Sequence, residues 1–126
     1  MLLQLPDLQQ AGVIDFLLDT GAAVTCLHPL DARSRIEVER SQLQGLQPWG
    51  RLIDVVGIGG SVSYYVTRAT YTFRQEDGHQ RSIDGQIQIA QVRREVQTLP
   101  SLLGWDVLQH FRIVADWAAR EVTLDS

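Results

Sequence analysis

Short apolar or alternating runs, separated by glycine-containing turns, make up most of this chain. Residues 51–58 and 61–73 are rich in β-branched and aromatic side chains and flank a pair of glycines, a pattern typical of a β-hairpin. Asp77 and Gly78 separate residues 71–75 from the alternating run at 80–89, which predicts a second hairpin. These two hairpins would form the longest strands of the protein.

The remaining pattern adds short strands and very little helix. Strand-like runs occupy residues 13–18, 22–27, 113–117 and 121–124. Residues 104–111 are the better helical candidate, because Trp105, Leu108 and Phe111 recur at roughly helical spacing. Residues 30–40 are a weaker candidate for a short helical turn. Many short strands with glycine turns favour an all-β fold, either a small barrel or a sandwich.

Length and composition narrow the class of protein. The chain has 126 residues, which is the size of a single domain, residues 1–126, with a substantial core. The net charge of −4 argues against nucleic acid or an anionic membrane as the main partner. The one cysteine, Cys26, excludes an intrachain disulfide, and no signal peptide or membrane span is recognisable. We therefore expect a cytoplasmic protein.

Candidate chemistry begins at Asp19, a carboxylate placed directly after the apolar residues 16–18. Thr20 and Gly21 follow it, so one interpretation is a simple turn at the end of a strand. An apolar run leading into a glycine recurs at Leu102, Leu103 and Gly104, without the aspartate. Two such segments facing each other would build one lobe around the carboxylate.

The segment at Asp19 resembles the active-site signature of the retropepsins, the retroviral-type aspartic proteases. Its members here are Asp19, Thr20, Gly21 and Ala22. Where that family has its glycine-rich flap, this chain has Gly57, Ile58, Gly59 and Gly60. Where the family has its second motif before the C-terminal helix, this chain has Leu102, Leu103 and Gly104. The three segments occur in the family's order and span nearly the whole chain.

The resemblance implies an all-β fold, a small closed barrel-like acid-protease lobe with a flap hairpin and one short C-terminal helix. It implies an aspartic endopeptidase that cleaves peptide bonds next to hydrophobic residues, on the acid side of neutral, without a metal or cofactor. Two adjacent carboxylates cannot both ionise, so they share a proton; one then activates water and the other protonates the carbonyl. Since each chain has one such aspartate, the implied partners are a second copy, as a homodimer, and a peptide or protein substrate.

Residue roles follow from the same resemblance. Asp19 would be catalytic, Thr20 would clamp the two loops of a dimer together, and Gly21 and Ala22 would form the floor beneath the substrate backbone. Ile58 and Gly59 would lie at the tip of the flap. Pro100 and Leu102 would line pockets for substrate side chains.

The chain departs from the retroviral pattern at positions that carry mutually supporting charges there. This chain has Ala23, Val24 and Trp105 instead, and we expect Trp105 to fill the space with apolar surface. The family's additional N-terminal strand is also missing, so a dimer would rest mainly on residues 121–124. These departures indicate a cellular or bacterial relative. They also keep an alternative open: a catalytically weak or inactive retropepsin-like domain used for binding or dimerisation.

Other residues offer less specific chemistry. Cys26 and His28 are two residues apart and allow a nucleophile pair or half a metal site, although a buried cysteine beside a surface histidine is the preferred interpretation. Trp105, Phe111 and Trp117 are expected to pack in the core. Three aspartates are candidates for a second carboxylate within one chain: Asp54, Asp84 and Asp106. We expect Asp106 to face solvent or to cap the short helix.

Overall fold

The computed structural model describes residues 1–35, 51–57, 60–90 and 99–125, and gives the backbone alone for residues 51–57 and 60–63. Its elements run in the order β1 (Leu2–Leu5), the 3-10 helix η1 (Pro6–Leu8), β2 (Gln10–Val13), β3 (Leu17–Leu18), β4 (Cys26–Leu27), α1 (Pro29–Ser34), β5 (Arg51–Gly57), β6 (Gly60–Arg74), β7 (Gln80–Ala90), β8 (Leu102–Leu103), α3 (Trp105–Leu108), β9 (Arg112–Asp116) and β10 (Glu121–Asp125).

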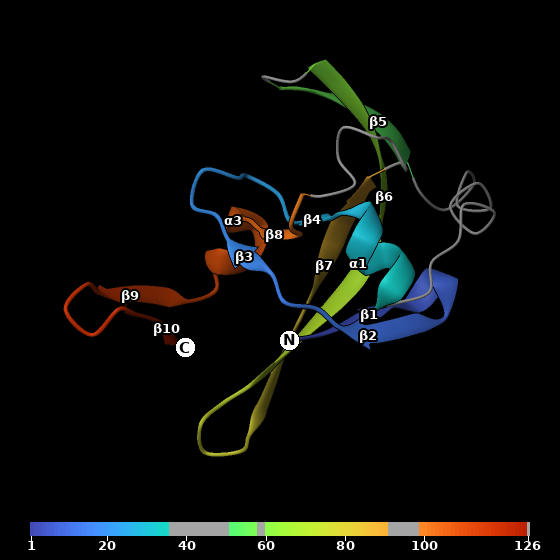
Figure 1. Cartoon of the computed structure of the whole chain (residues 1–126). Coiled ribbons are helices and arrows are strands. Elements are labelled where there is room, and N and C mark those ends of the chain that lie inside the picture. Colours follow the sequence, from blue (N-terminus) through green and yellow to red (C-terminus); the bar gives the residue numbers. More distant parts are fainter. Residues whose placement is uncertain (36–50, 58–59, 91–98, 126) are drawn as a thin grey trace.

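Eight of the strands form one sheet in the order β2-β1-β6-β7-β4-β8-β3, with β5 paired to β6. The described pairings leave β2 and β3 as the ends of this path, so the sheet is a curled half-barrel (Figure 1). The prediction of a mostly β protein is confirmed. Within the described ranges, no strand pairing joins β2 to β3, so the strand pairs do not close the sheet into a barrel.

Both predicted hairpins are present. Strands β5 and β6 pair in antiparallel register from Arg51 opposite Val66 to Gly57 opposite Gly60. Strands β6 and β7 pair over eleven positions, and their turn places Gly78 at a φ of 89°, in the left-handed region that glycine adopts without strain. Figure 1 shows both hairpins as one long, strongly bent ribbon through the molecule.

The core lies on the inner face of this bent ribbon. Alternate residues of β6 and β7 point inward, and Tyr71, Ile87 and Ile89 are fully or almost fully buried there. The Tyr71 hydroxyl donates a 2.6 Å hydrogen bond to the carbonyl oxygen of Gln86, which satisfies the one polar atom of this large side chain. Phe16, which leads toward Asp19, packs edge-on against the Tyr71 ring. The core therefore supports the chain just before the candidate site.

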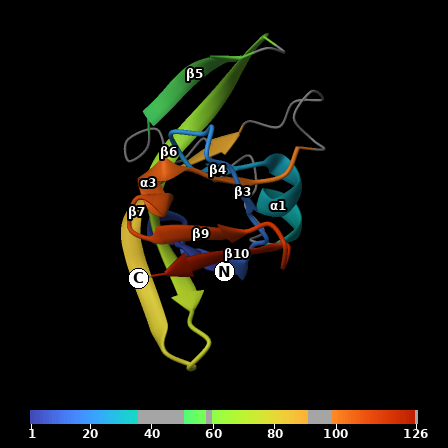
Figure 2. The same ribbon diagram turned by 90° about the vertical axis from the view of Figure 1, so that its left-hand side faces the viewer.

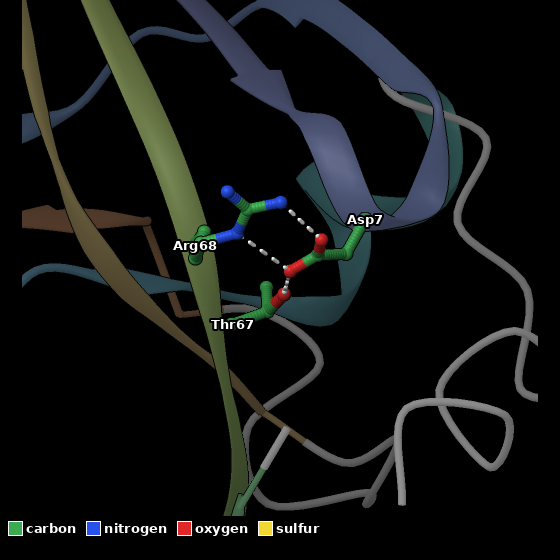
Figure 3. A network of polar contacts seen from close by, with 3 residues as sticks. All are labelled: Asp7, Thr67 and Arg68. Carbon is green, nitrogen blue, oxygen red and sulfur yellow. Dashed lines mark hydrogen bonds and ion pairs between the residues drawn. The ribbon is translucent and has the colours of Figure 1, made fainter. Parts of the chain in front are cut away.

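The N-terminal segment is tied to the centre of the sheet. Strand β1 pairs with both β2 and β6. Just beyond it, the Asp7 carboxylate of η1 accepts two hydrogen bonds from the Arg68 guanidinium of β6, of 2.6 and 3.2 Å (Figure 3). The Thr67 hydroxyl donates a longer bond of 3.5 Å to the same carboxylate. This ion pair lowers the pKa of Asp7 and fixes η1 against the edge of β6.

Two short helices and a separate hairpin complete the fold. Helix α3 confirms the predicted C-terminal helix. Helix α1 begins one residue before the weaker candidate at 30–40 and covers its first half, and residues 36–40 lie outside the described range. Strands β9 and β10 pair with each other as a two-stranded sheet (Figure 2). None of the described helices is long and apolar enough to cross a membrane.

Candidate active site

Asp19 lies at the end of β3, where the backbone is held against β8. The Leu17 N–H donates to the Ser101 carbonyl oxygen at 2.8 Å, and the Asp19 N–H donates to the Leu103 carbonyl oxygen at 3.1 Å. These bonds continue the parallel pairing of Leu17 with Leu102 and of Leu18 with Leu103. Two segments some eighty residues apart thus meet directly before the carboxylate, as the repeated apolar-to-glycine pattern predicted.

The loop after β3 fixes the direction of the Asp19 side chain. The Gly21 N–H donates a 2.9 Å hydrogen bond to Oδ1 of Asp19, and the Ala22 N–H donates to the Asp19 carbonyl oxygen at 3.2 Å. Asp19 is half-buried, whereas Thr20 and Gly21 are exposed. The carboxylate is therefore oriented by backbone groups and still open on one side.

The second motif interlocks with this loop through Gly104. A Cβ atom at this position would lie 2.5 Å from the carbonyl carbon of Val24, closer than real side chains come to backbone. The next two backbone N–H groups, of Trp105 and Asp106, donate to the carbonyl oxygens of Ala22 and Ala23 at 3.0 and 3.1 Å. The glycine is required here because one backbone crosses directly over the other.

Asp106 and the buried Thr25 secure this crossing. The Asp106 carboxylate accepts bonds from the Thr25 hydroxyl at 2.7 Å and from the Thr25 N–H at 3.0 Å. The same hydroxyl accepts a bond from the Gly104 N–H at 3.0 Å. Asp106 also accepts a 2.9 Å hydrogen bond from the Val107 N–H, which ties its carboxylate to the first turn of α3. The residue is half-buried, so it is not fully open to solvent. The sequence did not predict this role of Thr25. The only hint in the sequence is that a threonine ends the loop that begins at Asp19.

Trp105 differs from the expectation that it fills space with apolar surface. The residue is 43% exposed, and its indole N–H donates a 2.7 Å hydrogen bond to the Thr20 carbonyl oxygen. The prediction that the aromatic residues pack in the core is wrong for Trp105 and for Trp117, which is 95% exposed. Phe111 alone packs inward, edge-on against Phe73. Trp105 therefore supports the backbone of the Asp19 loop from outside.

Other predicted site residues fall on two sides of this loop. Leu102 is half-buried on β8, between β3 and β4, and Pro100 is exposed two residues before it. Gly57 and Gly60 close the β5–β6 hairpin, whose far end stands clear of the remaining strands (Figures 1 and 2). Ile58 and Gly59 lie outside the described residues.

His28 is buried, which corrects the interpretation of a surface histidine. Its Nδ1 lies 2.6 Å from the Pro100 carbonyl oxygen, and its backbone N–H donates to the Ser101 hydroxyl at 3.0 Å. That hydroxyl in turn donates to the Asp31 carboxylate at 2.6 Å. Burial lowers the pKa of His28, although the bond to Pro100 and the charge of Asp31 act in the opposite direction. This network anchors α1 to the segment leading into β8.

Cys26 does not offer a reactive thiolate. Burial and then the charges of Asp106 and Asp19 raise its pKa to about 11, so the thiol stays protonated at neutral pH. Its sulfur lies 3.7 Å from the carbonyl oxygen of Val24. Within the described ranges, no group of three His, Cys, Asp or Glu is placed to hold a metal ion. A cysteine nucleophile or metal centre therefore has no support from this geometry.

The candidate second carboxylates have other partners. Asp106 is engaged by Thr25, and Asp84 accepts a 2.8 Å hydrogen bond from the Thr70 hydroxyl on the β6–β7 hairpin. The side chain of Asp54 lies outside the described part of the chain. None of the hydrogen bonds described for Asp19 comes from another carboxyl group. Of the candidates whose side chains the structure describes, Asp84 and Asp106, neither is shown in contact with Asp19.

Comparison with known proteins found no match, either to the family models or among the curated proteins.

Proposed function

We propose that this chain is an aspartic endopeptidase of the retropepsin type, and that its active site forms between two copies of the chain. The observation that carries the proposal is the interlock of two loops around Asp19. The carboxylate is oriented by the Gly21 N–H, and Gly104 packs directly on the backbone of the same loop. A carboxylate held by backbone groups, yet accessible on one side, suits a general acid or base.

The proposed chemistry uses the two Asp19 carboxylates of a dimer as a pair. Like charges at close range leave the pair with one shared proton. The ionised member takes a proton from a water molecule, which attacks the peptide carbonyl, and the protonated member donates to the carbonyl oxygen. Exposed surface beside Asp19 supports a docking partner there, because Leu17 is 55% exposed on β3 and the Thr20 side chain is free to meet its counterpart.

The curled sheet is proposed to be the barrel-like lobe of such a protease. The β5–β6 hairpin would serve as the flap, with Gly57 and Gly60 at the base of its tip. Leu102, on the strand beside Asp19, and Pro100 before it would border pockets for hydrophobic substrate residues. Cleavage next to hydrophobic residues follows from these apolar walls.

The β9–β10 hairpin offers a second surface for the proposed dimer, separate from the Asp19 loop. Ile113 and Leu124, paired across its strands, pack against the core. On the same face, Val122 is 58% exposed beside the exposed Trp117, and the two border a cavity of about 490 Å³. Two-stranded hairpins are marginally stable without cover, and an exposed tryptophan is typical of interface centres. A second copy would cover this face.

The test is Asp19→Asn, which keeps the Oδ1 acceptor for the Gly21 N–H and removes the ionisable group. Cleavage of a library of peptides containing paired hydrophobic residues, in mildly acidic buffer, should be lost. Circular dichroism and sedimentation should be unchanged. Asp15→Asn is the matched control, since Asp15 is exposed and precedes β3, and it should cleave normally. Equal cleavage by the Asp19→Asn protein would refute the proposal.

A second candidate function is a retropepsin-like domain that binds or dimerises without hydrolysis. The observation that favours it is the uncovered apolar face of the β9–β10 hairpin, which needs no catalytic pair to bind a partner. Sedimentation tests the dimer that the protease requires, and a dimer that cleaves no peptide would still fit the second candidate. A strict monomer at high concentration leaves Asp19 without a second carboxylate and supports the binding function.

A further inference from the structure

A pocket of about 260 Å³ lies beyond the Asp19 loop, against β6 and β7. It is bordered by Val24 and Thr25 at the end of the loop, by Asp106 of α3, and by side chains of the two long strands, Val66, Gln86 and Gln88. Val66 stands directly opposite Gln88 in the register of the two strands. The pocket begins five residues after Asp19 along the same loop.

The charge of this pocket comes from Asp106. Each of its described hydrogen-bond donors is neutral: the N–H and hydroxyl of Thr25 and the N–H of Val107. Two of these donors bind Oδ1, so Oδ2 accepts a single bond and retains capacity for another. No ion pair of the described residues includes Asp106. Its negative charge is therefore held in place but not neutralised.

Of the arginines on β6 and β7, Arg68 lies nearest this pocket, on the same face of β6 as Val66 and two residues further along, and it is already engaged. Its guanidinium turns to Asp7 and makes both of the bonds drawn between these two residues in Figure 3. Arg51 of β5 stands opposite Val66, and its side chain lies outside the described part of the chain. The negative charge of Asp106 acts on neighbouring groups. Burial is the largest cause that raises the pKa of Cys26 and of Tyr71, and the charge of Asp106 is the second largest.

We infer that this pocket binds a basic side chain, lysine or arginine, of the polypeptide substrate. The methylene stem would lie against Val24 and Val66, while the ammonium or guanidinium group would donate to Asp106 and to the amide oxygens of Gln86 and Gln88. The volume accommodates one such side chain. That the ligand is part of a substrate rests on the proposed function. That the pocket binds a basic side chain is independent of the proposed function.

The experiment is a titration of the full chain with lysine blocked at both ends, followed by NMR of the backbone amides. Blocked norleucine, which has the same stem without the charge, is the matched control ligand. Blocked lysine should shift the amides of Thr25, Gln88 and Asp106 and bind at least about tenfold more tightly than norleucine, as expected for a charge-assisted contact. Equal affinities, or shifts confined to other residues, would overturn the inference.

Variants at Gln86 keep the test independent of folding. This side chain is exposed, and its backbone carbonyl, not its amide, bonds Tyr71. Gln86→Glu should tighten the binding of blocked lysine, and Gln86→Lys should weaken it by about fivefold or more, with norleucine unaffected. No difference between the two variants would contradict the site. Because binding is measured without cleavage, an inactive protein that binds lysine would refute the protease but not the pocket.

Discussion

Gly104 lies where two backbone segments cross at close range. Replacing it with alanine would place a methyl group 2.5 Å from the carbonyl carbon of Val24, so one of the two crossing segments must move. Overpacking of this kind lowers the free energy of unfolding by about 1–3 kcal/mol, and sometimes by more. Urea denaturation of Gly104→Ala should show this loss.

Gly85→Ala is the matched control for that substitution. The nearest atom to a Cβ at Gly85 is Cε2 of Tyr71 at 3.9 Å, an ordinary contact. The unfolding free energy of this variant should stay within about 0.5 kcal/mol of the parent protein. If Gly104→Ala were equally stable, the interlock of the two loops would be wrong.

His28 makes stability depend on pH. Burial holds its folded-state pKa below the ordinary value of 6.5, so the unfolded chain takes up a proton first as the pH falls. Its contribution is fully present above about pH 6.5 and is lost as the pH falls from there toward the folded-state pKa. The unfolding free energy measured across this range should decrease toward acid, and the slope should be smaller in His28→Gln. The same slope in both proteins would show that other groups govern the effect.

At the residue scale, the sequence was informative where the motif is local. Asp19 could be singled out from the residues beside it. The partnership of Thr25 with Asp106 spans 81 residues, and no local pattern encodes which carboxylate meets which hydroxyl. The burial of His28 and the exposure of Trp105 were mispredicted for a similar reason, because both depend on segments that meet only in the fold.

At the scale of elements, the β9–β10 hairpin is poorly covered, since most residues of both strands are exposed. Its inner end is anchored by Ile113 and Leu124, while its apolar face continues past the core to Trp117. The hairpins themselves were predictable, since alternation and turn residues act over a few positions. Strands β3, β4 and β8 have two residues each and depend on their neighbours. The sequence therefore predicted that the segments of β3 and β8 face each other, but not the register of these strands or the place of β4 between β7 and β8.

We predict that Trp117→Ser weakens the proposed dimer without unfolding the chain. A tryptophan at the centre of an interface contributes about 2 kcal/mol or more, so the dissociation constant should rise by about tenfold or more. Sedimentation equilibrium measures this directly. Leu30→Ser is the control, because Leu30 is also an exposed apolar residue, 61% exposed, but lies on α1. A dissociation constant unaffected by Trp117→Ser would exclude this face from the interface.

At the scale of the whole molecule, one chain provides half of the proposed catalytic machinery. The sheet, α3 and the crossing loops position a single Asp19, and the other described aspartates considered for a second role are engaged elsewhere. The all-β class followed from the sequence, but the open curl of the sheet did not, because closure depends on pairings between distant strands. The proposed function therefore depends on the assembly of two chains.

Mixing two forms of the chain tests this dependence most directly. Parent protein at constant concentration is incubated with increasing amounts of Asp19→Asn protein, and peptide cleavage is followed. If each active site needs two Asp19 residues, mixed dimers are inactive, and cleavage should fall toward zero as the variant exceeds the parent. Asp15→Asn protein added in the same amounts should not inhibit. Cleavage that stays constant as Asp19→Asn protein accumulates, while the two forms are shown to exchange subunits, would contradict an active site shared between two chains.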